Sequence, residues 1–478
     1  MPLNEKSFWT VAKAARMSVI VDAEDYFRHA RNAMLKARKR IMLIGWDFDA
    51  RINLVHDGHA RGEPAAVGEF IYWLVKRSPD LEVFLLRWDV GALKTLLRGS
   101  NIVTLAKWMS HPRIHTKLDS VHPVGGSHHQ KIVVIDDCIA FCGGIDMTSE
   151  RWDTRAHNDD EQRRVCPNGK SYAPWHDATT AVQGPVASAL GRLSRDRWHK
   201  AGGRALDPVD AVGECWPDNL IPDFRDIDVG IARTCPEMLD CAEVREIEAL
   251  FVEQIKSAQK SIYAESQYFA SRKIAEAIVA QLEKPDGAEI VIVNPLRAQG
   301  WLEPVAMDTA RARLFTALKA RDPHNRLRMY HPYSAGGEPI YVHAKILIVD
   351  DRILRIGSAN FNNRSMGLDT ECDVAICADG LDERVVRRIR DELLAEHLAT
   401  SRDRVAAEID QRGSLVAAIE ALRGAGRTLR PYEVPELTEV ETWLADNEVL
   451  DPESPSEMFE LMTRRGLLRR FRRRGAIR

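Results

Sequence analysis

The sequence predicts an α/β fold made of two similar halves, followed by a C-terminal appendage. Strand-like runs alternate with helix-like runs along most of the chain, which is the pattern of a largely buried sheet with helices on both faces. The order of these runs repeats after about 215 residues, so the repeat indicates a duplicated domain. The chain of 478 residues is long enough for two halves of ordinary size.

The elements that define the repeat come in matched pairs. Residues 25–50 predict an amphipathic helix that runs into a strand, and residues 247–271 repeat this design. Residues 67–89 and 274–296 each predict a helix, a turn and an apolar strand. Residues 380–425 are predicted to be helical, with a strongly amphipathic first part.

The domain boundaries follow from composition. A segment rich in Pro and Asp, residues 207–228, is predicted to be the linker between a first half at 1–206 and a second half at 229–405. Residues 406–478 form the predicted appendage, which is helical at first and irregular later. Four prolines interrupt its later part: Pro431, Pro435, Pro452 and Pro455.

The most specific part of the repeat is the pattern H-x-K-x4-D. An apolar, β-branched run inside each copy predicts a buried strand with the His and the Lys on the same side of the chain. A second apolar run and a turn of small residues follow each copy, GGID at 143–146 and GSAN at 357–360. Two copies in matched contexts occur by chance at a level of about one in a hundred or less. The six motif residues are His129, Lys131, Asp136, His343, Lys345 and Asp350.

At these residues the chain resembles the phospholipase D superfamily, whose mark is this duplicated motif followed by a GG or GS turn. The stretches GGIDMTSERWDT and VHAKILIVDDRILRIGSANFNNRSM are most similar to the two-motif lipid-cleaving branch, including its eukaryotic-type members. The resemblance covers about residues 20–400 and extends to the related cardiolipin synthases. It implies a duplicated phospholipase D fold, in which two α/β/α sandwich halves with mixed sheets are related by a pseudo-two-fold axis.

Two histidines from two symmetric halves suit the cleavage of a phosphodiester. One imidazole can attack phosphorus while the other protonates the departing alcohol. The resemblance implies that His129 forms a phosphohistidine and that His343 is the general acid, although the sequence does not itself show which histidine plays which part. The two lysines, Lys131 and Lys345, would neutralise the non-bridging phosphoryl oxygens.

Other residues are expected to support this chemistry. Each imidazole needs its second nitrogen held, and the resemblance places an acidic residue for this purpose at Asp177 and at Glu371. The motif residues Asp136 and Asp350 are expected to be structural, bonding the backbone or a lysine. The turns after the motifs put four residues where they could line the phosphate: Gly144, Asp146, Ser358 and Asn360.

Further residues match pocket positions of the family. These are Trp46, Trp152 and Gln267, together with Tyr263 and Tyr268. For the aromatic residues, packing in the core explains their presence as well as contact with substrate does.

No metal and no other cofactor is expected for the reaction, because the lysines supply the positive charge and no H-E-x-x-H motif is present. His122, His128 and His129 lie close together, but no Cys or Glu stands at ligand spacing. The eight cysteines show no CxxC pair and no zinc-like spacing. They are expected to be reduced, in a cytoplasmic protein.

The chain has features of a protein that works at a membrane surface without spanning it. No apolar run of 18 residues and no secretory signal of the usual kind occur, although export without an N-terminal signal stays open. Residues 464–478 hold eight arginines and no acidic residue. The net charge of the whole chain is −3, so the rest of the chain carries a net charge of −11. This tail is predicted either to attach to anionic lipid or to be a disordered, solubilising end. The segment 295–314, with Trp301, Leu302 and Met307, is either a lipid-facing loop or a cap on the core.

The predicted function is that of a phospholipase D, which hydrolyses a glycerophospholipid to phosphatidic acid and a free head-group alcohol, with transphosphatidylation as a second outcome. The nearest alternative is a cardiolipin synthase or related phosphatidyltransferase, which uses the same two motifs. A nuclease of the superfamily is disfavoured by the acidic body of the chain, so nucleic acid is not the expected partner. A non-catalytic lipid-binding module is disfavoured because both motifs are complete. The site is complete within one chain, which favours a monomer.

Overall fold

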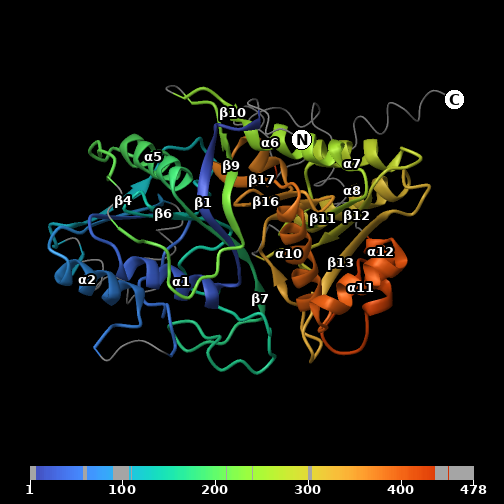
Figure 1. Cartoon of the computed structure of the whole chain (residues 1–478). Coiled ribbons are helices and arrows are strands. Elements are labelled where there is room, and N and C mark those ends of the chain that lie inside the picture. Colours follow the sequence, from blue (N-terminus) through green and yellow to red (C-terminus); the bar gives the residue numbers. More distant parts are fainter. Residues whose placement is uncertain are drawn as a thin grey trace.

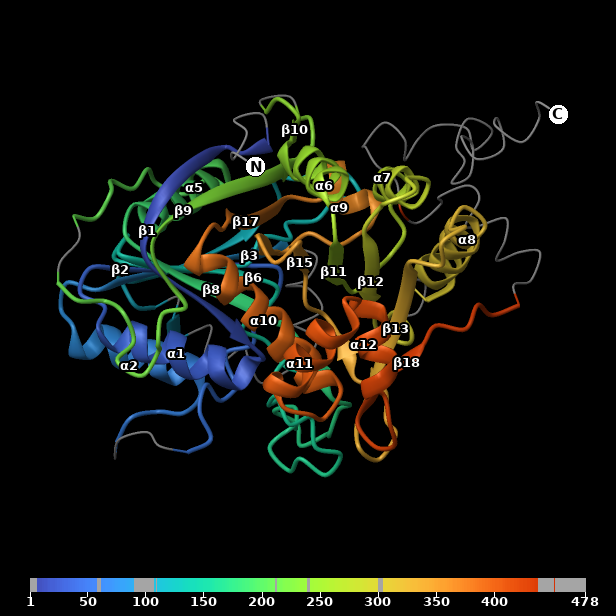
Figure 2. The same ribbon diagram turned by 45° about the vertical axis from the view of Figure 1, so that its right-hand side comes forward.

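A mixed sheet of 16 strands runs through the whole molecule and carries helices on both of its faces (Figures 1 and 2). The computed structural model describes residues 7–57, 62–89, 107–108, 110–210, 213–238, 241–299, 304–436 and 451. The fold is the predicted duplicated α/β fold with a mixed sheet.

Two long strands join the halves at the centre of the sheet. Strand β1 (Thr10–Val21) pairs antiparallel with β9 (Phe224–Cys235), and the two lie side by side in the middle of Figure 1. From this pair, each half extends outward through six corresponding strands in the same order, and a seventh strand follows at the edge of the second half. Because corresponding strands lie at corresponding positions, the pseudo-two-fold axis passes between β1 and β9.

The strands have the following bounds. Outward from β1, the first half contains β8 (Ala178–Gln183), β6 (Ile139–Gly143), β5 (Ile132–Ile135), β2 (Arg40–Gly45), β3 (Glu82–Trp88) and β4 (Ile114–Asp119). Outward from β9, the second half contains β17 (Glu371–Cys377), β16 (Ile353–Gly357), β15 (Ile346–Val349), β11 (Ser261–Glu265), β12 (Glu289–Val293), β13 (Leu327–Tyr333) and β18 (Thr428–Pro431). The neighbours in β2–β3–β4 and in β11–β12–β13 run parallel, and the other neighbours on this path run antiparallel. Two short strands, β7 (Trp175–His176) and β14 (Tyr341–Val342), form a separate parallel pair, and β10 (Val244–Arg245) pairs with β9.

The helices cover the sheet with apolar stripes. In α1, for example, Phe27, Ala30 and Met34 follow the three- and four-residue spacing of one helix face, and all three are fully buried. Among the described residues, the first half contains the helices α1 (Ala23–Leu35), α2 (Val67–Arg77) and α5 (Pro185–Lys200). Those of the second half are α6 (Glu246–Ser257), α7 (Arg272–Leu282), the short π-helix η2 (Pro304–Asp308), α8 (Thr309–Lys319), α9 (Asn363–Gly367), α10 (Leu381–His397), α11 (Arg402–Arg412) and α12 (Leu415–Leu422). Among the residues that the structure describes, no helix combines the length and the apolar character that crossing a bilayer requires.

The segment between the halves is packed against the first half. Residues 224–228 belong to β9, so the prediction of a linker over 207–228 is wrong for this part. Trp216 is buried, and its carbonyl oxygen accepts a hydrogen bond from Nζ of Lys36 at 2.7 Å. The Pro and Asp content, which suggested a linker, is here compatible with an irregular segment that contacts α1. The other domain boundaries stay predictions.

The region after residue 405 joins the second half more closely than an appendage would. Strand β18 pairs with β13 and so extends the sheet by one strand, and α12 buries Leu415 and Ile419 beside β12. The prediction of a separate appendage from residue 406 is therefore wrong for residues 406–431. The Arg-rich tail at 464–478 lies outside the described residues.

The segment 295–314 is only partly a loop. Trp301 and Leu302 lie outside the described residues. Met307 lies in η2 and is 4% exposed, within the apolar core of the second half. A lipid-facing role is therefore wrong for Met307, which packs in the core.

A disulfide links Cys138 to Cys215 across 77 residues of sequence. Cys138 lies in the turn between β5 and β6. Cys215 directly precedes Trp216, and both are buried in the core of the first half. The expectation that all eight cysteines are reduced is wrong, because only the tertiary fold brings this pair together. The cysteines therefore no longer support the expectation of a cytoplasmic location.

We predict that Cys215→Ala lowers the free energy of unfolding by about 2–4 kcal/mol, because the bond restricts the unfolded chain. Urea unfolding with and without reductant measures the effect, and thiol counting under denaturing conditions checks the bond itself. Cys166→Ala is the matched control, since Cys166 is not part of a disulfide and its loss leaves the cross-link intact. A protein in which all eight thiols react would contradict the prediction.

Candidate active site

The two H-x-K-x4-D motifs meet at the seam between the halves. The backbone N–H of His129 donates to the carbonyl of Thr370 at 2.9 Å, and that of His343 donates to the carbonyl of His176 at 2.7 Å. Each histidine is thus fixed by a backbone hydrogen bond to the opposite half. The strands β5 and β15, which follow the two histidines, are fully buried apolar runs that anchor each motif in the sheet.

Each histidine contacts a carboxylate of the other half. The Nδ1 atom of His129 lies 2.9 Å from a carboxylate oxygen of Glu371, and Nδ1 of His343 lies 2.6 Å from one of Asp177. Both carboxylates are fully buried. When Nδ1 donates to the carboxylate, a neutral imidazole carries its lone pair on Nε2, which is the atom a nucleophile or a general base needs.

The protonation state of the pair follows from burial and neighbouring charge. Burial, together with Lys131 and Lys345, lowers the pKa of His129 well below its usual value. Burial and Lys345 do the same for the pKa of His343. Burial raises the pKa of Glu371 to about 8, against the lowering effect of Lys131 and of a hydrogen bond from Ser358. Without a bound anion, both imidazoles are therefore uncharged at neutral pH.

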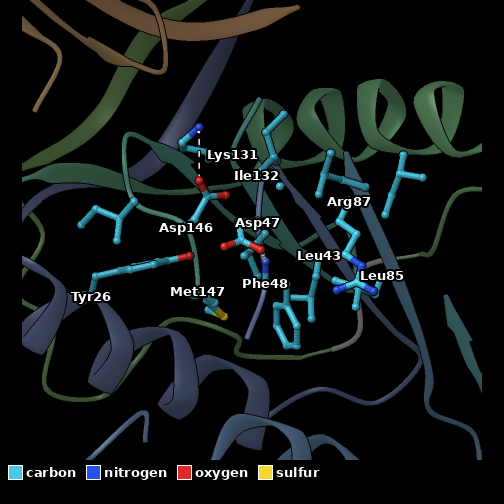
Figure 3. Close-up of a pocket in the computed structure, with 15 residues that line it drawn as sticks. Tyr26, Leu43, Asp47, Phe48, Leu85, Arg87, Lys131, Ile132, Asp146 and Met147 are labelled. Carbon is cyan, nitrogen blue, oxygen red and sulfur yellow. Dashed lines mark hydrogen bonds and ion pairs between the residues drawn. The ribbon is translucent and has the colours of Figure 1, made fainter. Parts of the chain in front are cut away.

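The two lysines differ in their partners. Nζ of Lys131 lies 3.3 Å from a carboxylate oxygen of Asp146, and Figure 3 shows the two side chains pointing toward one another. Nζ of Lys345 is hydrogen-bonded to the His343 carbonyl and lies 3.4 Å from the Gln267 side-chain oxygen; no carboxylate of the described residues is at ion-pair distance from it. Asn360 stands in the second turn where Asp146 stands in the first. Burial lowers the pKa of Lys345 to about 7, partly offset by Asp177.

A small cavity of about 20 Å³ lies behind Lys131 and Asp146 (Figure 3). It is lined by the ends of β2 and β3 and by the loop after Asp146, and polar groups from Asp47 and Arg87 face it. This volume is enough for about one water molecule. It is too small for a substrate head group, so the substrate does not bind in this cavity.

The small residues of the turns make room for the histidine partners. A Cβ atom on Gly144 would lie 2.2 Å from the Asp177 carboxylate, so only glycine leaves that carboxylate in place. The Ser358 hydroxyl donates to the Glu371 carboxylate, and Ser365 donates to the same group at 2.7 Å. Of the four turn residues expected near the phosphate, Gly144 and Ser358 thus contact the carboxylates, and Asp146 contacts Lys131. The side-chain oxygen of Asn360 is buried without a hydrogen-bond partner among the described residues.

The two motif aspartates bond the backbone. The Asp136 carboxylate accepts from the amides of residues 38, 39 and 40 at 2.6–2.8 Å. The Asp350 carboxylate accepts from the amides of residues 259, 260 and 261 at 2.7–2.9 Å. Each aspartate therefore holds the loop that leads into β2 or β11, at the far end of the strand from the histidine. Neither of these carboxylates is hydrogen-bonded to a lysine side chain.

The predicted pocket residues fall into different environments. The Gln267 side-chain amide donates to the hydroxyls of Tyr268 and Tyr341, both at 2.9 Å, next to Lys345. Trp46 donates its amide to Asp146 and stacks on Trp88. The Trp152 indole is buried in the core of the first half, with the rings of His56 and Trp152 separated by 4.6 Å. Tyr263 is buried and donates to Glu265, and His128 is buried beside Thr370.

A buried cluster of charged groups, which was not predicted from the sequence, lies beside the site. His157 Nε2 lies 3.4 Å from Asp22 and 3.1 Å from Glu396, and His176 Nδ1 lies 2.9 Å from Glu396. The cluster reaches the site through the Asp177 amide, which donates to Asp22 at 3.0 Å. A Glu-His pair at 396–397, on the buried face of an amphipathic helix, was the available signal. A second group, His176, Glu265 and His397, adjoins the first.

The first cluster could hold a metal ion. One donor atom from each of Asp22, His157, His176 and Glu396 lies within 4.8 Å of the others, and imidazole with carboxylate is a common ligand set for divalent metals. These residues come from both halves, so an ion there would brace the seam beneath His343. The chemistry proposed below takes no step through this cluster.

Comparison with known proteins places this geometry in a family. A family model described as phospholipase D matches residues 33–215, and one described as cardiolipin synthase, PLD-like domain, matches residues 251–394. The chain belongs to the phospholipase D superfamily. The two matches fall on the two halves, each of which carries one motif.

Curated relatives agree with this membership. The chain is 27% identical to phospholipase D alpha 1 of Nicotiana tabacum and 25% identical to that of Arabidopsis thaliana, with 74% of this chain and 60% of each relative covered. It thus spans less than two thirds of the length of these relatives. The crystal structure of phosphatidylserine synthase from Haemophilus influenzae Rd KW20 superposes with a TM-score of 0.55 at 14% identity, over 80% of this chain and 86% of that chain. This likeness concerns the fold.

We predict that the affinity of the site for inorganic sulfate falls as the pH rises above about 7, because Lys345 then loses its charge. Below that pH the lysine is charged; above it, the dissociation constant rises by up to about tenfold per pH unit until the pKa of the sulfate-bound lysine is reached. Titration calorimetry with sulfate, whose charge is constant over this range, measures the effect. Lys345→Arg keeps its charge and should flatten the profile; an equally steep profile in that variant would assign the titration to another group.

Proposed function

We propose that this protein is a phospholipase D, which hydrolyses a glycerophospholipid to phosphatidic acid and a free head-group alcohol. The observation that carries the proposal is the pair of buried histidine–carboxylate contacts, His129 with Glu371 and His343 with Asp177. Two imidazoles with free Nε2 atoms, flanked by two lysines, supply a nucleophile, an acid and a cradle for phosphoryl oxygens.

In the first step, Nε2 of His129 attacks phosphorus and forms a P–N bond. The P–O bond to the head group breaks, and its electron pair stays on the alcohol oxygen, which takes a proton from Nε2 of His343. The assignment of His129 as nucleophile follows the resemblance to the family. Each histidine has a buried carboxyl partner that, once ionised, stabilises the positive charge that an attacked imidazole acquires, so this contact suits either histidine as nucleophile.

In the second step, the now neutral His343 removes a proton from water, and the water oxygen attacks phosphorus. The P–N bond breaks and its electron pair returns to His129, so phosphatidic acid is released and both histidines are restored. His343 is uncharged in the free protein, and it must be protonated for the first step. The negative charge of a bound phosphodiester, which raises the pKa of the imidazole beside it, supplies this condition.

Lys131 and Lys345 support catalysis by holding the non-bridging oxygens, on which charge develops in the transition state. Gln267 adjoins Lys345, and with Tyr268 and Tyr341 it forms a polar wall that suits a phosphate or head-group contact. The phospholipid is thus the proposed partner. Attachment to an anionic membrane surface through residues 464–478 stays a proposal from the sequence.

A second candidate is a phosphatidyltransferase, in which an alcohol replaces water in the second step. The match of residues 251–394 to a family described as cardiolipin synthase favours it. The chemistry of both candidates shares the phosphohistidine, so they differ only in the acceptor. The acidic body of the chain argues against a nuclease, because nucleic-acid binding depends on basic groups.

The product distinguishes these candidates. The purified protein is incubated with mixed vesicles of phosphatidylcholine, phosphatidylethanolamine and phosphatidylglycerol, and the lipids are separated. We expect phosphatidic acid with free choline or ethanolamine. Cardiolipin as the main product would move the protein to the transferases, and the absence of any lipid product would contradict both.

We predict that His129→Ala and His343→Ala each lower kcat by at least about 1,000-fold, because each removes one half of the acid–nucleophile pair. In His343→Ala with a substrate bearing a good leaving group, the phosphatidyl group is expected to accumulate on His129, since water is no longer activated. Mass spectrometry of rapidly quenched protein locates it. A phosphatidyl group on His343 in the His129→Ala variant would reverse the two roles. His122→Ala is a matched control, because His122 bonds Asp89 and not the seam carboxylates.

A further inference from the structure

A third positively charged side chain, Arg151, lies beside His343. Its guanidinium carbon lies 4.3 Å from the centre of the Trp175 ring. The Trp175 ring lies 5.1 Å from the His343 ring and 4.6 Å from the Tyr341 ring, on which it stacks. The guanidinium plane is therefore held against an aromatic wall that continues to the proposed general acid.

Arg151 has no anionic partner in the described part of the chain. Its Nη1 donates to the backbone carbonyl of Glu150 at 3.2 Å, and its Nε is buried without a hydrogen-bond partner. Arg163 is a useful contrast, since it stacks on Trp152 at 5.0 Å and is also paired with the Glu161 carboxylate at 2.8 Å. The stacking alone thus does not distinguish Arg151; its missing counter-ion does.

The surroundings of Arg151 make its unpaired charge destabilising. Its charge acts on His343, Lys345 and Asp177, which places it within electrostatic range of the reacting groups. Lys345 likewise lacks a carboxylate at ion-pair distance among the described residues. Two cations within electrostatic range of one another in a partly buried site repel one another, so the arrangement favours the binding of an anion.

We propose that Arg151 is a third cationic ligand of the reacting phosphoryl group, acting together with Lys131 and Lys345. A guanidinium is planar and can donate two parallel hydrogen bonds to two phosphoryl oxygens, which an ammonium cannot do. Stacking on Trp175 fixes the plane in advance, so less entropy is lost when the anion binds. The inference rests on the proposed phosphodiester chemistry and adds a residue that the H-x-K-x4-D pattern does not contain.

The test compares Arg151→Gln, Arg151→Lys and the matched control Arg163→Gln. Two quantities are measured in the full chain: kcat/KM on a soluble short-chain phospholipid, and the dissociation constant of inorganic sulfate. For Arg151→Gln we expect kcat/KM to fall about 100-fold, mainly through kcat, and sulfate to bind about tenfold more weakly. For Arg151→Lys we expect kcat/KM to fall about tenfold, because the charge remains but the pair of parallel hydrogen bonds from the guanidinium is lost. Arg163→Gln should stay within about twofold of the wild type in both.

Chemical rescue separates contact with substrate from a structural role. Guanidinium ion added to Arg151→Ala should restore part of kcat, whereas the same concentration of sodium chloride should not. Arg151→Gln with wild-type kcat/KM and sulfate affinity would overturn the inference while leaving the proposed function intact. If the wild type cleaves no phospholipid but sulfate binding still depends on Arg151, the proposed function fails and the assignment of an anion-binding Arg151 stands.

Discussion

The active site depends on carboxylates that each half supplies to the histidine of the other half. His129 is held by Glu371 and His343 by Asp177, and in both cases the histidine and its partner come from opposite halves. Both carboxylates are fully buried, where an unpaired charge would be strongly destabilising. Neither half can therefore complete a histidine site alone. The pairing of β1 with β9 keeps the two halves in one sheet and so holds each histidine next to the carboxylate of the opposite half.

The two halves differ in the charges that surround their lysines, and this difference bears on function. Lys131 is paired with Asp146, but Asn360 takes the corresponding place in the second half and leaves Lys345 without a carboxylate at ion-pair distance among the described residues. Arginines after the two turns differ in the same sense: Arg364 is paired with Asp369, and Arg151 has no such partner in the described chain. Positive charge thus accumulates on the His343 side. An anionic phosphodiester would restore the balance there and would at the same time favour the protonated form of His343.

The seam is reinforced beneath the site. The cluster of Asp22, His157, His176 and Glu396 joins residues of both halves, and its contact with the Asp177 amide links it to the partner of His343. Gly144 shows how little freedom remains, since even one added carbon atom would displace the Asp177 carboxylate. Rigid support of this kind is what a pre-organised site requires, because a small misplacement of a reacting group costs much of the rate.

The sequence by itself determined the duplicated α/β fold and the two motifs, because each depends on local periodicity or on a short spacing. The strands at 132–135 and 346–349 and the helices at 381–422 follow from such patterns. The two carboxylates were expected only from the resemblance to the family. Only the tertiary structure decided which carboxylate serves which histidine, that Cys138 meets Cys215, and that Arg151 lies beside His343. The same holds for β18, which joins the sheet although Pro431 at its end and the prolines that follow predicted an irregular region. Contacts between residues far apart in sequence arise from packing of whole elements, and spacing along one chain carries no record of them.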